Sequence, residues 1–136
     1  SLITAVDTSV LLDVLGGDPK FGPRSAAALR ASLAEGQVVA CDVVWAECSG
    51  SLPDAETTLD RLATLRVSYS AIGADAATAA GAIWRSYRRA GGLRERVIPD
   101  FMIGAHALIQ ADRLLTRDRG LYRSHFRDLA IVDPTA

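Results

Sequence analysis

The sequence contains little cysteine, and this shortage excludes two classes of small protein. Only two of its 136 residues are cysteine, and neither stands in a CxxC or Cys/His ligand pattern. The chain is therefore neither a disulfide scaffold nor a zinc module. We expect Cys41 and Cys48 to be buried free thiols of a cytoplasmic protein, because a reducing compartment keeps thiols unpaired.

Long apolar runs and a surplus of one charge are also missing. The first apolar run, residues 2–6, stops at Asp7 and has no basic segment before it. We therefore expect neither a signal peptide nor a membrane span. Fifteen basic residues face sixteen acidic ones, which leaves a net charge of −1. This balance excludes a protein that holds nucleic acid by bulk positive charge, so the positions of the acids become informative.

What the sequence does contain is a regular alternation of short apolar strands and helices. Apolar residues make up 49% of the chain, enough for one domain over residues 1–136 with a substantial core. The pattern predicts strands and helices in turn, and such alternation is typical of right-handed crossovers. We therefore expect a three-layer α/β/α fold with a mostly parallel, five-stranded central sheet. The predicted strands are 2–6, 37–41, 67–70, 113–116 and 130–132, and the predicted helices are 9–15, 23–35, one capped by Asp42, 53–65, 73–90 and 99–111.

Four acidic residues fall where ligands bind in such folds, beyond the carboxyl ends of the strands. Asp7 ends the first strand, and Asp118 lies two residues past the fourth. Glu47 lies early in the helix after the second strand, and Asp100 begins the helix that leads to the fourth. We expect the four to meet at one edge of the sheet. Taken singly, Asp100 would also be explained as a helix cap, and Asp118 would also be explained as a turn residue.

Glu47 is the least ordinary of these acids, because Val43 and Val44 lie one turn before it. We expect it to share their inward face. A carboxylate that points into an apolar core needs a partner or a metal ion.

Converging carboxylates repel one another and stay ionised together only when a cation compensates them. Oxygen ligands favour Mg²⁺ or Mn²⁺. Such a site activates water and stabilises the charge on a phosphate. Thr8, Ser9 and Thr116 adjoin the acids in sequence. Their hydroxyls orient the acids or satisfy nearby backbone groups, and the sequence leaves both roles open.

Four segments in this order resemble the PIN-domain family, and within it the VapC-type toxins of bacterial type II toxin–antitoxin systems. The resemblance covers nearly the whole chain, and its specificity lies in the ordered set rather than in any one motif. The segments are VDTSVLLD at 6–13, AE at 46–47, PDFMIGAHA at 99–107 and LLTRDRGLY at 114–122.

The resemblance implies a PIN-like fold and an endoribonuclease that depends on Mg²⁺ or Mn²⁺. It also implies neutralisation by a cognate VapB-type antitoxin, an RNA substrate and a homodimer. The catalytic and metal-binding positions of the family carry over onto Asp7, Glu47, Asp100 and Asp118. The hydroxyl positions carry over onto Ser9 or Thr8 and onto Thr116. Asp13 also recurs in the first motif, and we interpret it as structural or orienting rather than as a ligand.

The arginines form two groups, and most are expected on solvated helix faces. Arg117 and Arg119 bracket Asp118, so they are the best candidates for contact with substrate phosphates. His106 is expected to face the core or a neighbouring subunit. The remaining arginines of the two groups are Arg85, Arg88, Arg89, Arg94, Arg96, Arg123 and Arg127.

Other functions fit the sequence less well. A non-catalytic PIN-like module that binds RNA or protein is the main alternative, and the intact acidic set argues against it. A receiver-type signalling domain would need paired acids and a late lysine, but Lys20 is the only lysine. A DxD phosphatase is excluded because residue 9 is serine. A pair of histidines acting without metal is formally open, but no motif supports His106 and His125 in that role.

Overall fold

The central sheet has five strands, all parallel, in the order β3-β2-β1-β4-β5. The computed structural model describes residues 1–92 and 98–136. The fold class and the five-stranded sheet are confirmed. The strands are β1 Leu2–Val6, β2 Gly36–Cys41, β3 Val67–Ser70, β4 Arg113–Leu115 and β5 Ile131–Val132. The helices are α1 Thr8–Leu15, α2 Gly22–Glu35, α3 Asp42–Gly50, α4 Ala55–Thr64, α5 Ala74–Arg89, α6 Ile98–Gln110 and α7 Arg119–His125.

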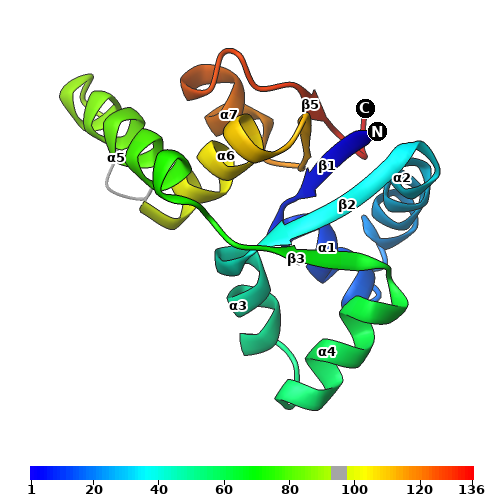
Figure 1. Ribbon diagram of the computed structural model, residues 1–136. Coiled ribbons are helices and arrows are strands. Elements are labelled where there is room, and N and C mark those ends of the chain that lie inside the picture. Colours follow the sequence, from blue (N-terminus) through cyan, green and yellow to red (C-terminus); the bar gives the residue numbers. More distant parts are fainter. Residues whose placement is uncertain (93–97) are drawn as a thin grey trace.

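Helices cover both faces of the sheet (Figure 1). The chain first moves outward from β1 through β2 to β3, and right-handed crossovers in that direction place α1 to α4 on one face. It then returns past β1 to β4 and β5, so α5 to α7 cover the opposite face. This reversal makes the carboxyl ends of β1 and β4 the switch point of the fold, where open parallel sheets bind their ligands.

The sequence located most elements to within two residues. The strands β1 and β3 have the predicted bounds, and Asp54 caps α4 by accepting a hydrogen bond of 2.7 Å from the Thr57 N–H. The predicted cap of α3 is wrong: Cys41 is the N-cap, and Asp42 is the first helical residue. The short helix α7 was not predicted. The first residue of β2 is Gly36. It lies so close to Leu2 that a Cβ there would collide with the Leu2 carbonyl oxygen, so no larger residue fits.

The core lies on both sides of the central strands. Leu114 and Leu115 of β4 have no exposed surface, and Val6 of β1 is 1% exposed. Cys41 and Cys48 are buried free thiols, as expected. Within residues 1–92 and 98–136, no helix is both long and apolar enough to cross a membrane.

Candidate active site at the carboxyl edge of the sheet

Each strand ends in a polar residue or is followed by one, at the same edge of the sheet. Asp7 and Thr116 follow β1 and β4, the two strands that flank the switch point. Asp42 follows β2, and Asp133 follows β5, while Ser70 is the last residue of β3. The crevice expected of this topology is therefore lined by a carboxylate on one strand and a hydroxyl on its neighbour.

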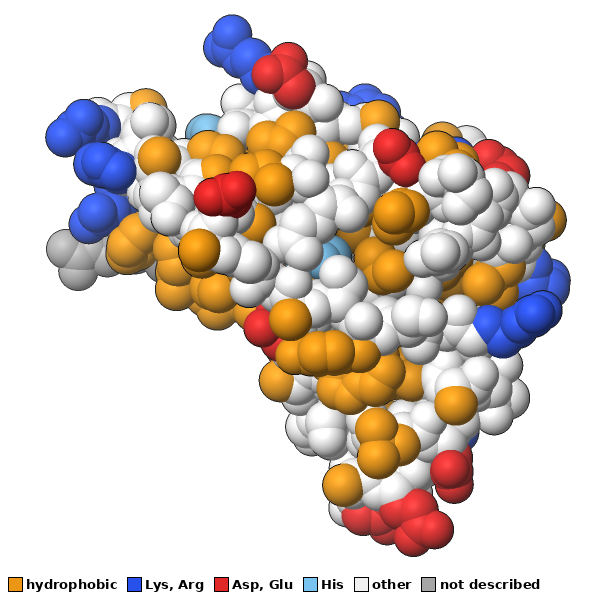
Figure 2. Space-filling view, viewed as in Figure 1, with side chains coloured by type: hydrophobic (Ala, Val, Ile, Leu, Met, Phe, Trp, Pro, Cys, Tyr) orange, Lys and Arg blue, Asp and Glu red, His pale blue; other side chains and the backbone are white. Residues whose placement is uncertain are grey.

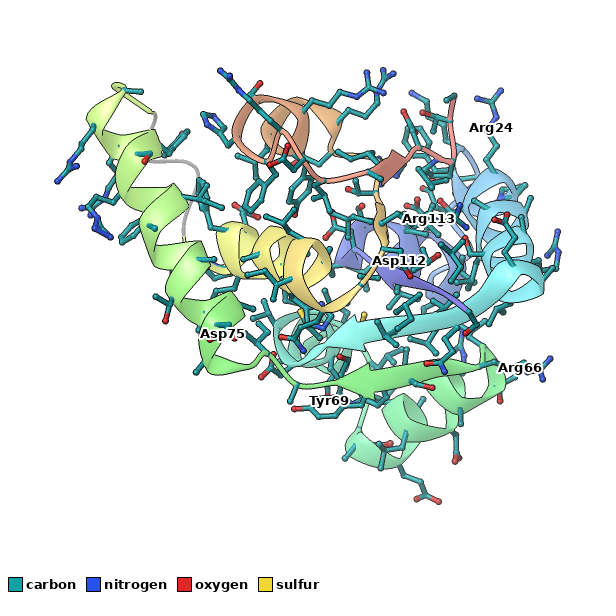
Figure 3. All side chains as sticks on the ribbon, turned by 45° about the horizontal axis from the view of Figure 1, so that its top comes forward. Arg24, Arg66, Tyr69, Asp75, Asp112 and Arg113 are labelled. Carbon is teal, nitrogen blue, oxygen red and sulfur yellow. The ribbon has the colours of Figure 1, made fainter. Side chains whose placement is uncertain are left out.

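Polar residues at the opposite edge have structural bonds instead (Figure 3). The Asp112 carboxylate accepts a hydrogen bond of 2.7 Å from the Ile3 N–H. The Arg113 guanidinium donates to the Thr4 hydroxyl at 2.9 Å and pairs with Glu35 at 3.3 Å. These contacts join the start of β4 to its neighbours, so the charges of Asp112 and Arg113 serve the sheet itself.

Asp7 is the buried centre of the candidate site, with 7% of its surface exposed. Its Oδ1 accepts a hydrogen bond of 2.8 Å from the Thr8 N–H, which caps α1. Its Oδ2 accepts a hydrogen bond of 2.6 Å from the Thr116 hydroxyl. The oxygen of that hydroxyl in turn accepts a bond of 2.9 Å from the Asp118 N–H. One threonine thus links two of the predicted acids.

The electrostatic environment of Asp7 disfavours its charged form. The pKa of Asp7 is raised from 3.8 to about 6, mainly by burial and in part by the carboxylates of Asp118 and Glu47. The hydrogen bonds from Thr116 and Thr8 act in the opposite direction. Two predicted acids therefore repel the charge of the third, Asp7, and a cation among them would remove the repulsion.

Glu47 belongs to this group, but its predicted inward orientation is wrong. Its side chain is exposed, whereas Val44 and Cys48 of the same helix are fully buried. Val44 and Cys48, four residues apart, form the face of α3 that packs on the core, and Glu47 lies at the margin of that face. Its Oε1 accepts a hydrogen bond of 2.6 Å from the Thr8 hydroxyl. Thr8 therefore contacts Asp7 with its N–H and Glu47 with its side chain.

Asp100 lies in the first turn of α6 and is half-buried. This helix contacts β1 and α3, the elements that carry Asp7 and Glu47. The described part of the chain nevertheless holds no group of three Asp, Glu, His or Cys side chains close enough to bind one ion. The structure thus relates Asp7, Asp118 and Glu47 by charge and by shared hydroxyls, and it places Asp100 on an adjoining helix.

The residues present fit a hard divalent cation by their chemistry. All the candidate donors are oxygen atoms, the preferred ligands of Mg²⁺ and Mn²⁺. The Ser9 hydroxyl is buried two residues from Asp7 and has no hydrogen-bond partner among the described residues. An unpaired buried hydroxyl beside a buried carboxylate is a polar group still available to a ligand.

The family of the chain follows from a comparison with known domains. A model of the PIN domain matches residues 4–126. The chain belongs to the PIN-domain family. The resemblance found in the sequence motifs is thereby confirmed, and the match includes Asp7, Glu47, Asp100 and Asp118. No curated protein sequence matches the chain.

Solved structures of similar fold include toxin–antitoxin complexes. VapBC2 from Rickettsia felis, bound to a fragment of its promoter DNA, superposes with a TM-score of 0.77 at 14% identity, over 97% of this chain and 98% of that one. DNA-bound VapBC from Salmonella typhimurium gives 0.76 at 17% identity, over 98% and 99%. FitAcB from Neisseria gonorrhoeae gives 0.71 at 22% identity, over 97% and 98%. At these identities the likeness concerns the fold.

The two arginines expected to contact substrate have partners within the PIN domain. The Arg117 guanidinium donates two hydrogen bonds to Asp13, at 2.7 and 2.9 Å, and lies over the ring of Phe21. Arg119 forms an ion pair of 2.8 Å with Asp133. Contact with phosphate stays a prediction for both residues. Asp13 is 5% exposed and also accepts a bond from Ser25, which agrees with a structural role.

The arginines of α5 are in a different situation. Arg85, Arg88 and Arg89 are exposed, and the Arg88 guanidinium lies 4.1 Å from the ring centre of Trp84. Figure 2 shows basic side chains gathered at the outer end of this helix. The predicted positions Arg94 and Arg96 lie outside the described residues.

Sequence reasoning missed a second polar group at this edge, formed by Asp42, Ser70 and His106. His106 is 1% exposed, and its Nε2 lies 2.9 Å from the Ser70 hydroxyl. Burial lowers the pKa of His106, and the nearby Asp42 carboxylate opposes that shift. The sequence did place Asp42 directly after a strand, where site residues are expected. Its position was instead explained by capping of the next helix.

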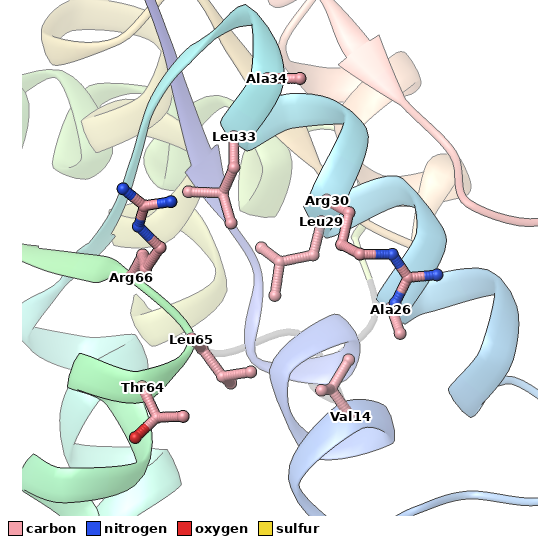
Figure 4. A pocket seen from close by; sticks show the side chains of 9 residues that line it. All are labelled: Val14, Ala26, Leu29, Arg30, Leu33, Ala34, Thr64, Leu65 and Arg66. Atoms are coloured by element: carbon pink, nitrogen blue, oxygen red, sulfur yellow. The ribbon is translucent and has the colours of Figure 1, made fainter.

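The PIN domain also has a hollow of about 530 Å³ outside the acidic site. It lies between α1, α2 and the turn from α4 to β3 (Figure 4). Val14, Leu29 and Leu65 contribute apolar walls, and the guanidiniums of Arg30 and Arg66 also line it. An apolar hollow with two cations suits an apolar segment that carries acidic side chains.

Proposed function

We propose that this PIN domain is a VapC-type toxin: an endoribonuclease that depends on Mg²⁺ or Mn²⁺ and is neutralised by a cognate antitoxin. The observation that carries the proposal is the buried carboxylate of Asp7 at the switch point. Its pKa is raised by burial and by two further acids, Asp118 and Glu47. Membership of the PIN family and the likeness to solved toxin–antitoxin complexes support the same function.

Asp7, Asp100 and Asp118 are the proposed metal ligands, and Glu47 joins them as a ligand or acts on the attacking water. A bound divalent ion would supply a water molecule activated at neutral pH and would stabilise charge on the phosphate. A near-neutral chain suits this chemistry, because the ion rather than a basic surface would attract the phosphate.

The chain's own residues prepare the site before any substrate arrives. Thr116 holds one oxygen of Asp7, and the Thr8 N–H holds the other, so the carboxylate cannot rotate. Glu47 is exposed, and the Thr8 hydroxyl fixes its Oε1. A carboxylate at the open side of the site, oriented by one hydroxyl, is placed to accept the proton of a water that attacks the phosphate. Loss of the 3′ oxygen would leave 5′-phosphate and 3′-hydroxyl ends.

The test is cleavage of total cellular RNA by purified protein, with mapping of the new ends. Wild type is expected to cut with Mg²⁺ or Mn²⁺ and to stop in excess EDTA, and Asp7→Asn is expected to be inactive although folded. Asp112→Asn is the matched control, because this acid lies at the opposite edge of the sheet. Equal cleavage by wild type and folded Asp7→Asn would overturn the mechanism. Binding of antitoxin or RNA without any cleavage would favour a non-catalytic module.

The hollow beside α2 is the proposed seat of an apolar, acid-bearing segment of the antitoxin. Charge complementarity supports this occupant, since Arg30 and Arg66 line an otherwise apolar recess. Reversing both charges, Arg30→Glu with Arg66→Glu, is expected to weaken antitoxin binding at least about tenfold while RNA cleavage continues. Arg24→Glu, an exposed position on the same helix but outside the hollow, is the control. Unchanged antitoxin affinity in the double variant would exclude this seat.

A homodimer is the proposed assembly of the free toxin. Tyr69 is 55% exposed on the edge strand β3, and Ile109 of α6 is 45% exposed. Figure 2 shows apolar side chains gathered on the face of the molecule that β3 crosses in Figure 1. Such patches are typical of interfaces. Sedimentation of wild type and Tyr69→Glu at several concentrations tests the proposal, with a shift to monomer expected in the variant.

A further inference from the structure

The polar group of Asp42, Ser70 and His106 has no part in the chemistry described so far. It lies at the same edge of the sheet, where α6 passes the ends of β2 and β3. His106 is almost fully buried, and one carboxylate oxygen of Asp42 is buried without a hydrogen-bond partner among the described residues. Burying polar groups in this way opposes folding, so their retention at a candidate active site calls for a role.

The contacts of α6 indicate what that role is. His106 contacts Ser70 on one side of the helix, and two residues earlier Gly104 faces the ring of Phe126. Two residues correspond to about 200° around a helix, so these contacts lie on nearly opposite sides. A Cβ on Gly104 would lie 2.6 Å from the Phe126 ring, which shows how closely the helix approaches it. Gln110 binds the Gly73 N–H and the Ala71 carbonyl at the far end of α6.

A helix held on opposite sides can neither rotate nor slide. Asp100 lies six residues before His106, about 9 Å along the axis of the same helix. Rotation of α6 would therefore move Asp100 relative to β1 and α3, which the helix contacts. On the side of β3, the bond between His106 and Ser70 resists rotation together with the bonds of Gln110, and it lies four residues nearer to Asp100.

We propose that His106, through its hydrogen bond with Ser70, is a positioning residue that fixes α6, and with it Asp100, against the acidic edge of the sheet. The proposal rests on the proposed function, because it assigns Asp100 to the metal-binding set. Groups that hold metal ligands in place typically change metal affinity by 10–100-fold when they are removed. A residue with only a packing role would lower stability without that effect.

The experiment measures Mn²⁺ binding by calorimetry without RNA, beside the midpoint of thermal unfolding in EDTA. His106→Leu is expected to weaken Mn²⁺ binding about tenfold. His106→Gln, which returns a polar group near the place of Nε2, is expected to restore binding to within about threefold. Ser70→Ala removes the hydroxyl but leaves the ring, and it tests the same bond should His106→Leu fail to fold. Ile103→Val, a core change on the same helix, should lower the midpoint and leave Mn²⁺ affinity unchanged.

The outcomes separate this inference from the proposed function. Wild-type Mn²⁺ affinity in folded His106→Leu or Ser70→Ala would overturn the positioning role, even where RNA cleavage by wild type supports the function. Failure of wild type to cleave RNA, with Mn²⁺ affinity lost in His106→Leu and restored in His106→Gln, would overturn the function and leave the positioning role supported. Failure of His106→Gln to restore affinity would also overturn the role, because the polar contact would then not be what matters.

Discussion

Asp13 and Arg117, 104 residues apart in the sequence, form a two-pronged hydrogen-bonded ion pair. The pair joins the middle of α1 to the segment that follows β4. Asp13 has 6% of its side chain exposed, and Arg117 has 27%. Because Thr116 directly precedes Arg117, this pair also anchors the segment whose hydroxyl holds Asp7.

The first prediction is that Arg117→Met acts on stability rather than on RNA affinity. The change removes the guanidinium from the ring of Phe21 and leaves the buried Asp13 carboxylate without its cation. Removing one partner of such a pair typically costs about 3 kcal/mol, so urea unfolding should shift by an amount of that order. RNA affinity of the Asp7→Asn background should change less than about twofold at low salt, because the guanidinium is held by Asp13. A large loss of RNA affinity with normal stability would assign Arg117 to the substrate instead.

The second prediction concerns pH and Asp7. Its pKa is about 6 in the folded chain against 3.8 in the unfolded chain. The folded state therefore binds the proton more tightly, and the stability this provides is present below pH 3.8 and is lost as the pH rises to about 6. At pH 7.5, without metal, Asp7→Asn should be more stable than wild type by about 3 kcal/mol, because a neutral amide avoids the buried charge.

Urea unfolding of both proteins in EDTA from pH 4.5 to 7.5 measures this effect. The difference between them should shrink as the pH falls, and Mg²⁺ should stabilise wild type more than the variant. A difference that does not depend on pH would show that the buried charge of Asp7 is not its cause.

The third prediction is that Thr116 matters through its hydroxyl. Thr116→Val keeps the shape but removes the bond to Asp7 and the acceptor for the Asp118 N–H. Because the Thr116 bond lowers the pKa of Asp7, its loss should raise that pKa and move the acidic limb of Mn²⁺ binding to higher pH. Thr116→Ser, which keeps the hydroxyl, is the control and should stay close to wild type. Identical pH profiles for all three would contradict the role.

The fold was predictable because its strands are short, apolar and separated by clear helix signals. The pattern of Leu2–Val6 and of Val67–Ser70 gave their bounds directly. The helix α7 escaped prediction because its seven residues are too few and too polar to show a helical period. Gly36 caps the end of α2, as expected of a glycine after a helix, and it is also the first residue of β2, where it packs too closely against Leu2 for a side chain.

The candidate site was predictable where it follows from topology and not where it depends on side-chain direction. Parallel strands bring their carboxyl ends together, so the places of Asp7 and Asp118 followed from the strand pattern. The outward turn of Glu47 depends on which residues of α3 face the core, and that face is formed by Val44 and Cys48, not by Val43. The partners of Arg117 and His106 lie 104 and 36 residues away, and no local pattern specifies such contacts.

The last prediction tests the packing of α6 from the side opposite His106. A Cβ on Gly104 would lie 2.6 Å from the ring of Phe126, a buried residue with little freedom to move. Gly104→Ala should therefore destabilise the chain by about 2 kcal/mol, although alanine usually favours a helix. Phe126→Leu leaves more room there, so the double variant should lose less stability than the two single changes added together. Strict additivity in urea unfolding would show that the ring is not what excludes a side chain at position 104.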